Sequence, residues 1–248
     1  MIPLPIPTFE IDLPPYMKHN LRSILLLAGL MLFMGGCGPK FLGEELKEGY
    51  IKYNITYPNP GDKEGLIGVL PDQMLLSFKE NKVRTDLKAG FGMFSLSTIS
   101  HEPNTKLTHL CRIITSKYVV DLDQNGAQEM LKLFPKYSVE PLGEVKEIAG
   151  YTCKSAKITD TDNPDLSFKV FYTDKIKVNA PNWFTPFHQI DGMLMEYEID
   201  KFNMHMKLVA EEVSSDSIAV ETFKRPGGYK PINYPSLEGK LEKIMDDQ

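Results

Sequence analysis

The sequence is poor in the residues that most often carry chemistry. It has three cysteines, one tryptophan and five histidines among 248 residues. No pair of histidines shows His-x-x-x-His spacing and no pair of cysteines shows Cys-x-x-Cys spacing, so no metal site is predicted. Gly-x-Ser-x-Gly, P-loop and dinucleotide-binding motifs are also absent. We therefore predict that the protein is not an enzyme and needs no cofactor or metal.

The sequence also lacks a block of charge of one sign. It contains 28 Lys and Arg against 33 Asp and Glu, a net charge of −5. The basic residues are scattered along the chain, whereas a nucleic-acid-binding domain concentrates them on one face. A polybasic segment that would adhere to anionic lipid headgroups is missing as well. These patterns exclude a nucleic-acid partner and predict no electrostatic attachment to a membrane.

No apolar run is long enough for an ordinary membrane span, which needs about 20 residues. The longest run is 23–34, preceded by Lys18 and Arg22 and followed by Gly35, Gly36 and Cys37. A basic stretch, a short apolar stretch and small residues in this order are typical of a secretory signal peptide. An uncleaved short anchor and an ordinary secreted protein are the alternatives.

The end of this segment, Met34-Gly35-Gly36-Cys37, resembles the lipobox of bacterial lipoproteins. The resemblance implies cleavage before Cys37, acylation of the Cys37 thiol and attachment to a membrane through that lipid. Met34 departs from the pattern, which most often has Leu at this position. Because Gly38 follows Cys37 in place of the Asp that retains lipoproteins in the inner membrane, the resemblance favours the outer membrane, with the protein facing the periplasm.

The rest of the sequence divides into four parts. Residues 1–36 are expected to be the signal peptide, of which the proline-rich 1–16 lacks a basic residue and is expected to precede the true start. Residues 37–48 form the lipidated cysteine and a tether, and 49–229 form one β-rich domain. The tail, 230–248, is expected to be loosely ordered.

Short alternating segments separated by turn residues predict a protein made mainly of strands. No βαβ rhythm is present, so we expect a curved antiparallel sheet or unclosed half-barrel with one or more short helices. The expected strands are 49–57, 74–79, 82–88, 93–100, 106–115, 118–122, 150–159, 167–173, 193–199, 202–213 and 217–223.

Two features of residues 49–229 each allow two interpretations. Asp121, Asp123 and Asn125 have the spacing of a calcium loop, but Lys132 stands where that loop needs a bidentate Glu. We therefore interpret these residues as a turn and the cap of a short helix that ends near Phe134. Cys111 and Cys153 can either form a disulfide or pack separately as small apolar side chains.

An aromatic loop followed by two methionine-rich strands has the highest apolar content in the later part of the sequence. Methionine is frequent where a surface accepts varied apolar partners, although plain core packing explains the same residues. The functional interpretation is an apolar groove or cavity that takes an acyl chain. Its candidate ligand-binding residues are Trp183, Phe184, Phe187, Met193, Met195, Met204 and Met206.

Residues 147–156, Glu-Ile-Ala-Gly-Tyr-Thr-Cys-Lys-Ser-Ala, resemble a strand of β-rich periplasmic lipoprotein domains of unknown function. Segments like 172–173, 190–197 and 223–226 follow it in those proteins. The resemblance covers about 49–229 and implies the LolA/LolB-like fold, an unclosed β-barrel with helices across its mouth. No residues here match the functional residues of LolA or LolB.

Two functions are compatible with these patterns. The first is a lipid-anchored envelope lipoprotein whose curved sheet binds an apolar ligand or acyl chain. The second is a non-catalytic scaffold or interaction subunit of an envelope protein complex, with an exposed aromatic loop at 183–187 as its contact surface.

Overall fold

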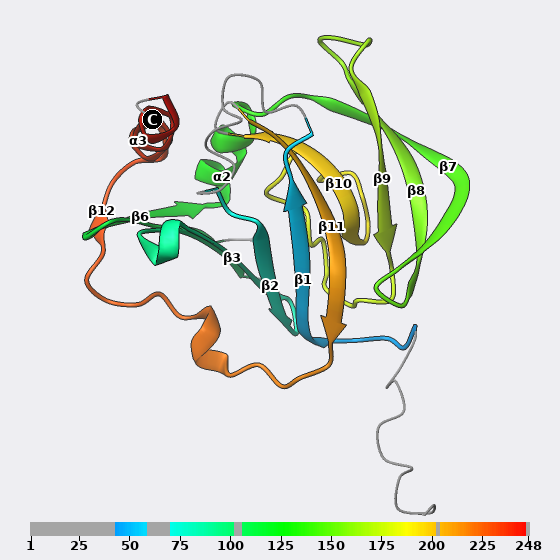
Figure 1. Cartoon of the computed structure of the whole chain (residues 1–248), viewed down its shortest axis with the longest axis horizontal. Coiled ribbons are helices and arrows are strands. Elements are labelled where there is room, and N and C mark those ends of the chain that lie inside the picture. Colours follow the sequence, from blue (N-terminus) through cyan, green and yellow to red (C-terminus); the bar gives the residue numbers. More distant parts are fainter. Residues whose placement is uncertain (1–42, 59–69, 102–105, 202–203, 247–248) are drawn as a thin grey trace, which may run out of the picture. The chain divides into compact units, whose positions relative to one another are not determined.

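A computed structural model describes residues 43–58, 70–101, 106–201 and 204–246. These residues form one compact unit built on a 12-stranded sheet that does not close on itself. Figure 1 shows the strands bending strongly along the sheet, with few helices beside them. The prediction of a mainly β protein with a curved, unclosed sheet is confirmed. The predicted signal peptide and Cys37 lie outside the described residues.

The first half of the sheet is an antiparallel meander in which each strand pairs with the next. The turn between the second and third strands is Glu80-Asn81, and Glu80 takes a positive φ of 54°. This is the hairpin that the sequence predicts between 74–79 and 82–88. The six strands are β1 (Glu48–Thr56), β2 (Gln73–Lys79), β3 (Lys82–Ala89), β4 (Phe94–His101), β5 (Lys106–Ile113) and β6 (Ser116–Asp123).

The second half is another antiparallel meander, and the two halves join where its last strand pairs with β1. That seam runs from Tyr50 opposite Ser214 to Thr56 opposite Lys207. The free edge beyond β6 carries a two-residue parallel strand, β12 (Lys230–Pro231). The strands of the second meander are β7 (Tyr137–Ile148), β8 (Tyr151–Asp160), β9 (Ser167–Thr173), β10 (Met193–Lys201) and β11 (Met204–Ser214).

In the described residues, two α-helices and two short 3-10 helices accompany the sheet. Helix α2 (Gln124–Leu131) is capped by Asp123, whose carboxylate accepts a hydrogen bond from the Gly126 N–H at 2.8 Å. This confirms the helix-cap interpretation of the calcium-like motif. Helix α3 spans Tyr234–Asp246, and the 3-10 turns are η2 (Gly90–Gly92) and η3 (Val220–Phe223).

Both faces of the sheet bury apolar side chains, because strand residues alternate between the faces. On the concave face, α2 and α3 cover β4–β6 through Leu107, Val120 and Leu237. On the convex face, the segment after β11 crosses the same strands and places Phe223 against Ile99. The sheet around β4–β6 is therefore packed from both sides.

Three segments differ from the sequence-based expectation. Residues 137–148 form the edge strand β7, which the sequence analysis did not predict; its side chains are mostly exposed and it contains Pro141, as edge strands do. Residues 217–223 were expected to be a strand but contain the 3-10 turn η3. The tail expected to be loosely ordered forms β12 and α3, and α3 is anchored by buried Tyr234 and Leu237.

Cys111 and Cys153 are both buried and unpaired. They belong to different apolar clusters. Cys111 packs beneath α2 and α3, whereas Cys153 belongs to a cluster that includes residues of β1 and β8. Burial raises the pKa of the Cys111 thiol to about 12 and that of Cys153 to about 11, so both remain protonated at neutral pH. Of the two alternatives, separate packing is the one observed.

Candidate functional site

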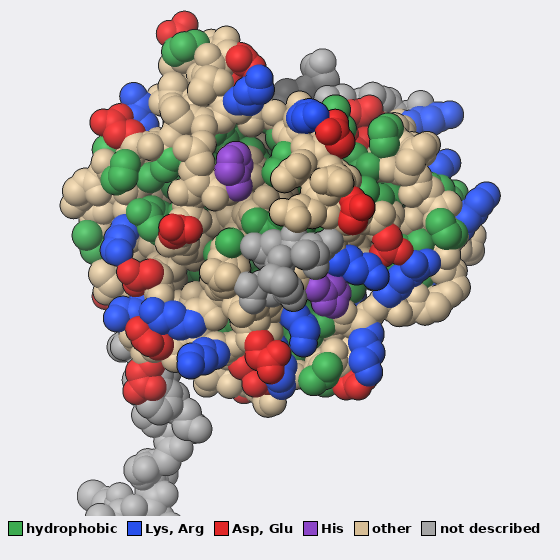
Figure 2. All heavy atoms as spheres, turned by 180° about the vertical axis from the view of Figure 1, so that it is seen from behind, with side chains coloured by type: hydrophobic (Ala, Val, Ile, Leu, Met, Phe, Trp, Pro, Cys, Tyr) green, Lys and Arg blue, Asp and Glu red, His purple; other side chains and the backbone are tan. Residues whose placement is uncertain are grey.

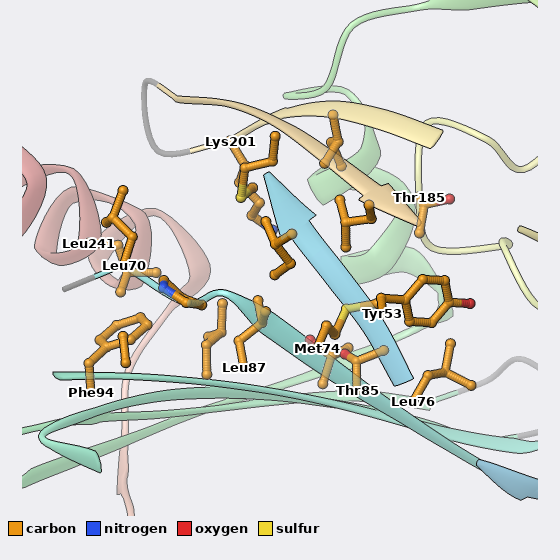
Figure 3. A pocket seen from close by; sticks show the side chains of 18 of the residues that line it. Tyr53, Leu70, Met74, Leu76, Thr85, Leu87, Phe94, Thr185, Lys201 and Leu241 are labelled. Atoms are coloured by element: carbon orange, nitrogen blue, oxygen red, sulfur yellow. The ribbon is translucent and has the colours of Figure 1, made fainter. Parts of the chain in front are cut away.

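A cavity of about 720 Å³ occupies the concave side of the sheet. Strands β1–β4 form one wall, β10 and β11 a second, and the segment between β9 and β10 closes it on another side. The C-terminal half of α3 borders one end. Side chains from segments far apart in the sequence therefore meet in one chamber, part of which is shown in Figure 3.

The walls are apolar because regular alternation turns one face of each strand inward. In β1, Ile51, Tyr53 and Ile55 are buried while the residues between them are partly exposed. Tyr53 and Ile55 line the cavity. Neighbouring strands repeat the pattern at their own inward positions, and these lining residues are Met74 and Leu76 of β2, Val83, Thr85 and Leu87 of β3, Leu96 and Thr98 of β4, and Met206 and Leu208 of β11.

The segment between β9 and β10 is held in place by polar contacts of its own. The Asn182 side-chain amide donates to the carbonyl oxygens of Ile190 and Gly192, both at 2.9 Å. The Trp183 indole N–H donates to the Ser100 hydroxyl of β4 at 2.6 Å. This segment therefore bridges the two meanders and fixes one side of the cavity.

Several polar groups beside the cavity are already engaged by protein atoms. The Tyr53 hydroxyl donates to the Leu194 carbonyl oxygen, and the Tyr57 hydroxyl to the Pro71 carbonyl oxygen, both at 2.7 Å. Thr98 Oγ1 lies 3.0 Å from His109 Nδ1. These contacts leave mainly hydrocarbon facing the chamber, which suits an apolar ligand.

The end of the cavity beside α3 differs from the rest. Met93 and Ile114, 55 % and 61 % exposed, both line the cavity, so it reaches the surface at this end. Lys201, at the end of β10, and Lys240 and Lys243 of α3 also line it. In Figure 3, Leu241, Leu70 and Phe94 lie at one end, and Tyr53, Leu76 and Thr185 lie toward the other. The chamber thus has a mouth beside α3 and an apolar interior.

Four of the candidate ligand-binding residues line this cavity: Phe184, Phe187, Met193 and Met206. Trp183 is instead half-buried against the cluster beneath α2 and α3. The Met204 side chain and Cys37 lie outside the described residues. None of the aromatic side chains at 183–187 is exposed, and Phe187 is 1 % exposed, so the exposed aromatic loop that motivated the scaffold hypothesis is not present.

Met195, another of the candidate ligand-binding residues, is completely buried but does not line the cavity. The register of β10 against β9 shifts between Leu194 and Glu196, which places one extra residue there and breaks the alternation. Glu196 alternates with the cavity-lining Tyr197 and therefore lies on the other side of β10, where its carboxylate accepts hydrogen bonds from Lys146 and Lys207. Burial opposes ionisation of Glu196, but the two lysines outweigh it and keep its pKa below the usual value.

Sequence reasoning missed most of the cavity wall. The alternation in 51–57 and 83–87 was visible as strand patterning, yet nothing in it distinguished a cavity wall from packed core. The α3 lysines were missed because their segment was expected to be loosely ordered. Within the described ranges, no group of three His, Cys, Asp or Glu side chains converges as a metal site, and no helix is long and apolar enough to cross a membrane.

Comparison with known families adds one finding. Residues 68–176 match a domain of unknown function, DUF4412. The DUF4412 match covers less than half of the chain and takes in β2 to β9. It therefore includes the β2–β4 wall of the cavity and leaves out β1, β10, β11 and α3. No curated protein matches the sequence.

Proposed function

We propose that this protein is a lipid-anchored envelope lipoprotein that binds an apolar ligand or acyl chain in the cavity on the concave face of its sheet. The observation that carries the proposal is a chamber of about 720 Å³ with walls of Leu, Ile, Val, Met and Phe. Pockets for small molecules typically measure about 300–1,000 Å³ and are lined mainly by apolar side chains. The non-catalytic role expected from the sequence fits this proposal.

The burial of hydrocarbon provides enough free energy for such a role. Each buried methylene contributes about 0.8 kcal/mol, so about ten methylenes contribute about 8 kcal/mol. This corresponds to a dissociation constant of about 1 μM before the cost of ordering the chain is subtracted. An acyl chain in this cavity would therefore bind reversibly, as a carrier or sensor of lipids requires.

The anchoring part of the proposal rests on the lipobox resemblance at Cys37. Lipid on this thiol would hold the domain at the outer membrane, facing the periplasm, close to a supply of acyl chains. The further resemblance to the LolA/LolB-like fold is consistent with an unclosed sheet around an apolar chamber. These resemblances support the location and the ligand class.

The proposal is tested by filling the cavity. Leu87 is half-buried and lines the chamber, so Leu87→Trp adds bulk inside it. Leu75, on the adjacent strand, is 40 % exposed and does not line the chamber, so Leu75→Trp is the matched control. The full chain would be purified from membranes, and non-covalently held lipid would be extracted with organic solvent and quantified by mass spectrometry.

We expect wild type and Leu75→Trp to carry the same lipid in similar amounts and Leu87→Trp to carry several-fold less. The lipid attached to Cys37 is covalent, remains with the protein and therefore does not contribute. Equal loading of all three proteins, or no extractable lipid in any of them, would contradict ligand binding in this chamber.

A further inference from the structure

The charged residues that line the cavity are all of one sign. Lys201, Lys240 and Lys243 line it, and among the described residues no Asp or Glu does. The whole sequence has the opposite bias, with 33 acidic against 28 basic residues. On the face seen in Figure 2, by contrast, the two signs are interspersed. The lining therefore differs from the rest of the molecule in charge.

The three lysines belong to the same end of the chamber. Lys240 and Lys243 are three residues apart on α3, a spacing that places them on neighbouring positions of one helix face. Lys201 interacts electrostatically with Glu238 of the same helix. Because Met93 and Ile114 expose the cavity at this end, the lysines lie beside its mouth and the apolar walls lie beyond them.

Two of the lysines lie against aromatic rings beside the mouth. Lys240 Nζ lies 5.0 Å from the centre of the Tyr118 ring, and Lys201 Nζ lies 5.3 Å from that of Phe134. Both ammonium groups are thus placed against aromatic rings at the rim. Glu238, whose carboxylate accepts a hydrogen bond from the Tyr234 hydroxyl, is the acidic group of α3 that acts on Lys201. Burial lowers the pKa of Lys201, so an added anion would stabilise its charged form.

We infer that the ligand is an acidic amphiphile, whose carboxylate or phosphate group binds between Lys201, Lys240 and Lys243 while its apolar chain extends into the chamber toward Tyr53. This inference rests on the proposed function, because it assigns the chemistry and orientation of a ligand in the same cavity. A fatty acid and a phospholipid fragment share this chemistry, so both are tested.

The experiment compares three ligands that share one palmitoyl chain. Palmitate carries a carboxylate, 1-palmitoyl lysophosphatidic acid carries a phosphate and monopalmitoylglycerol is neutral. Binding of each is measured by equilibrium dialysis below its micellar concentration, with the full chain transferred from detergent into amphipol. Leu87→Trp in the same amphipol provides the background.

The variant Lys240→Gln/Lys243→Gln removes two exposed charges from the mouth and should leave folding intact. Lys117→Gln/Lys224→Gln removes the same net charge elsewhere and is closely matched, because Lys117 also lies over a tyrosine ring, that of Tyr229, at 5.7 Å. We expect the mouth variant to bind palmitate or lysophosphatidic acid at least about tenfold more weakly, as the loss of charge-assisted hydrogen bonds implies. Its affinity for monopalmitoylglycerol should stay within about twofold, and the control variant should behave as wild type.

The failure of the inference and that of the proposed function give different results. If monopalmitoylglycerol binds as tightly as the acidic ligands, or if the mouth variant retains the preference for them, the acidic amphiphile is refuted while cavity binding stands. If no ligand binds above the Leu87→Trp background, cavity binding itself fails, and the inference fails with it. A preference for palmitate or for lysophosphatidic acid supports the inference in either case and identifies the acidic group.

Discussion

Acid should destabilise this protein through one buried histidine. His109 of β5 is 6 % exposed, its Nδ1 lies 3.0 Å from Thr98 Oγ1, and its ring packs against Tyr234 with centroids 5.4 Å apart. Its Nε2 is buried without a hydrogen-bond partner in the described part of the chain. Burial, with a smaller contribution from the positive charge of Lys201, lowers the pKa of His109 to about 3.

The direction and size of the effect follow from the two states. Above about pH 6.5 His109 is neutral in both the folded and the unfolded chain and has no effect on the pH dependence. Below this pH His109 becomes protonated in the unfolded chain but stays neutral in the folded protein until about pH 3. The free energy of unfolding therefore falls as the pH falls. The loss is about 1.4 kcal/mol for each pH unit, or about 2 kcal/mol at pH 5. This is a large share of the 5–15 kcal/mol typical of a folded domain.

The assay is urea unfolding between pH 7.5 and pH 5, followed by the fluorescence of Trp183, the single tryptophan. His109→Phe keeps a ring against Tyr234 but cannot titrate, so its stability should change by about 2 kcal/mol less than that of wild type over this range. Thr98→Val removes the hydrogen-bond partner and leaves the imidazole buried, so it should keep the wild-type pH dependence. If His109→Phe loses stability with acid as steeply as wild type, the assignment to His109 is refuted.

Two further predictions concern the sheet itself. Glu196→Gln weakens a buried carboxylate that pairs with two lysines, so it should lower the free energy of unfolding, measured with urea at pH 7, by about 1–3 kcal/mol. Glu129 is in an ion pair whose two side chains are about two-thirds exposed, so Glu129→Gln should lower it by less than about 0.5 kcal/mol. Equal losses in the two variants would contradict the expected effect of burial. Gly49 has a φ of 151°, and Gly49→Ala would place a Cβ atom 2.0 Å from the Ser214 carbonyl oxygen, so it should lower the melting temperature by several degrees. Gly143 has open space around the position of a Cβ atom, so Gly143→Ala should leave the melting temperature unchanged. An unchanged melting temperature in Gly49→Ala would show that the β1–β11 seam tolerates the shift.

The strands that bury one face were predictable because their alternation is regular. Residues 49–57 and the hairpin over 74–88 show the period of two in the sequence and form β1, β2 and β3. Strand β7 was not predictable by the same reasoning, since it lies at the sheet edge with most side chains in solvent and contains Pro141. A strand without a buried face leaves no hydrophobic pattern.

The cavity was only partly predictable for a related reason. The apolar content of 183–206 indicated where ligand contacts could lie, and Phe184, Phe187, Met193 and Met206 do line the chamber. Alternation failed at Met195, because the register shift beside it reverses the face, and a register shift has no mark in the sequence. Sequence patterning also cannot separate a wall from a filled core, since both require the same inward residues.

The sheet order explains why the cavity depends on more than the DUF4412 segment. Residues 68–176 supply β2–β6 on one flank of the sheet and β7–β9 on the other. The strands between those flanks, β1, β11 and β10, all lie outside the match. Within the sheet, the two flanks are therefore joined through β1, β11 and β10, and the seam of β1 and β11 pairs residues more than 150 positions apart. The chamber has walls on both sides of that seam, so the matched segment forms only one of them. The other wall and the lysines come from β1, β10, β11 and α3, which lie outside the match.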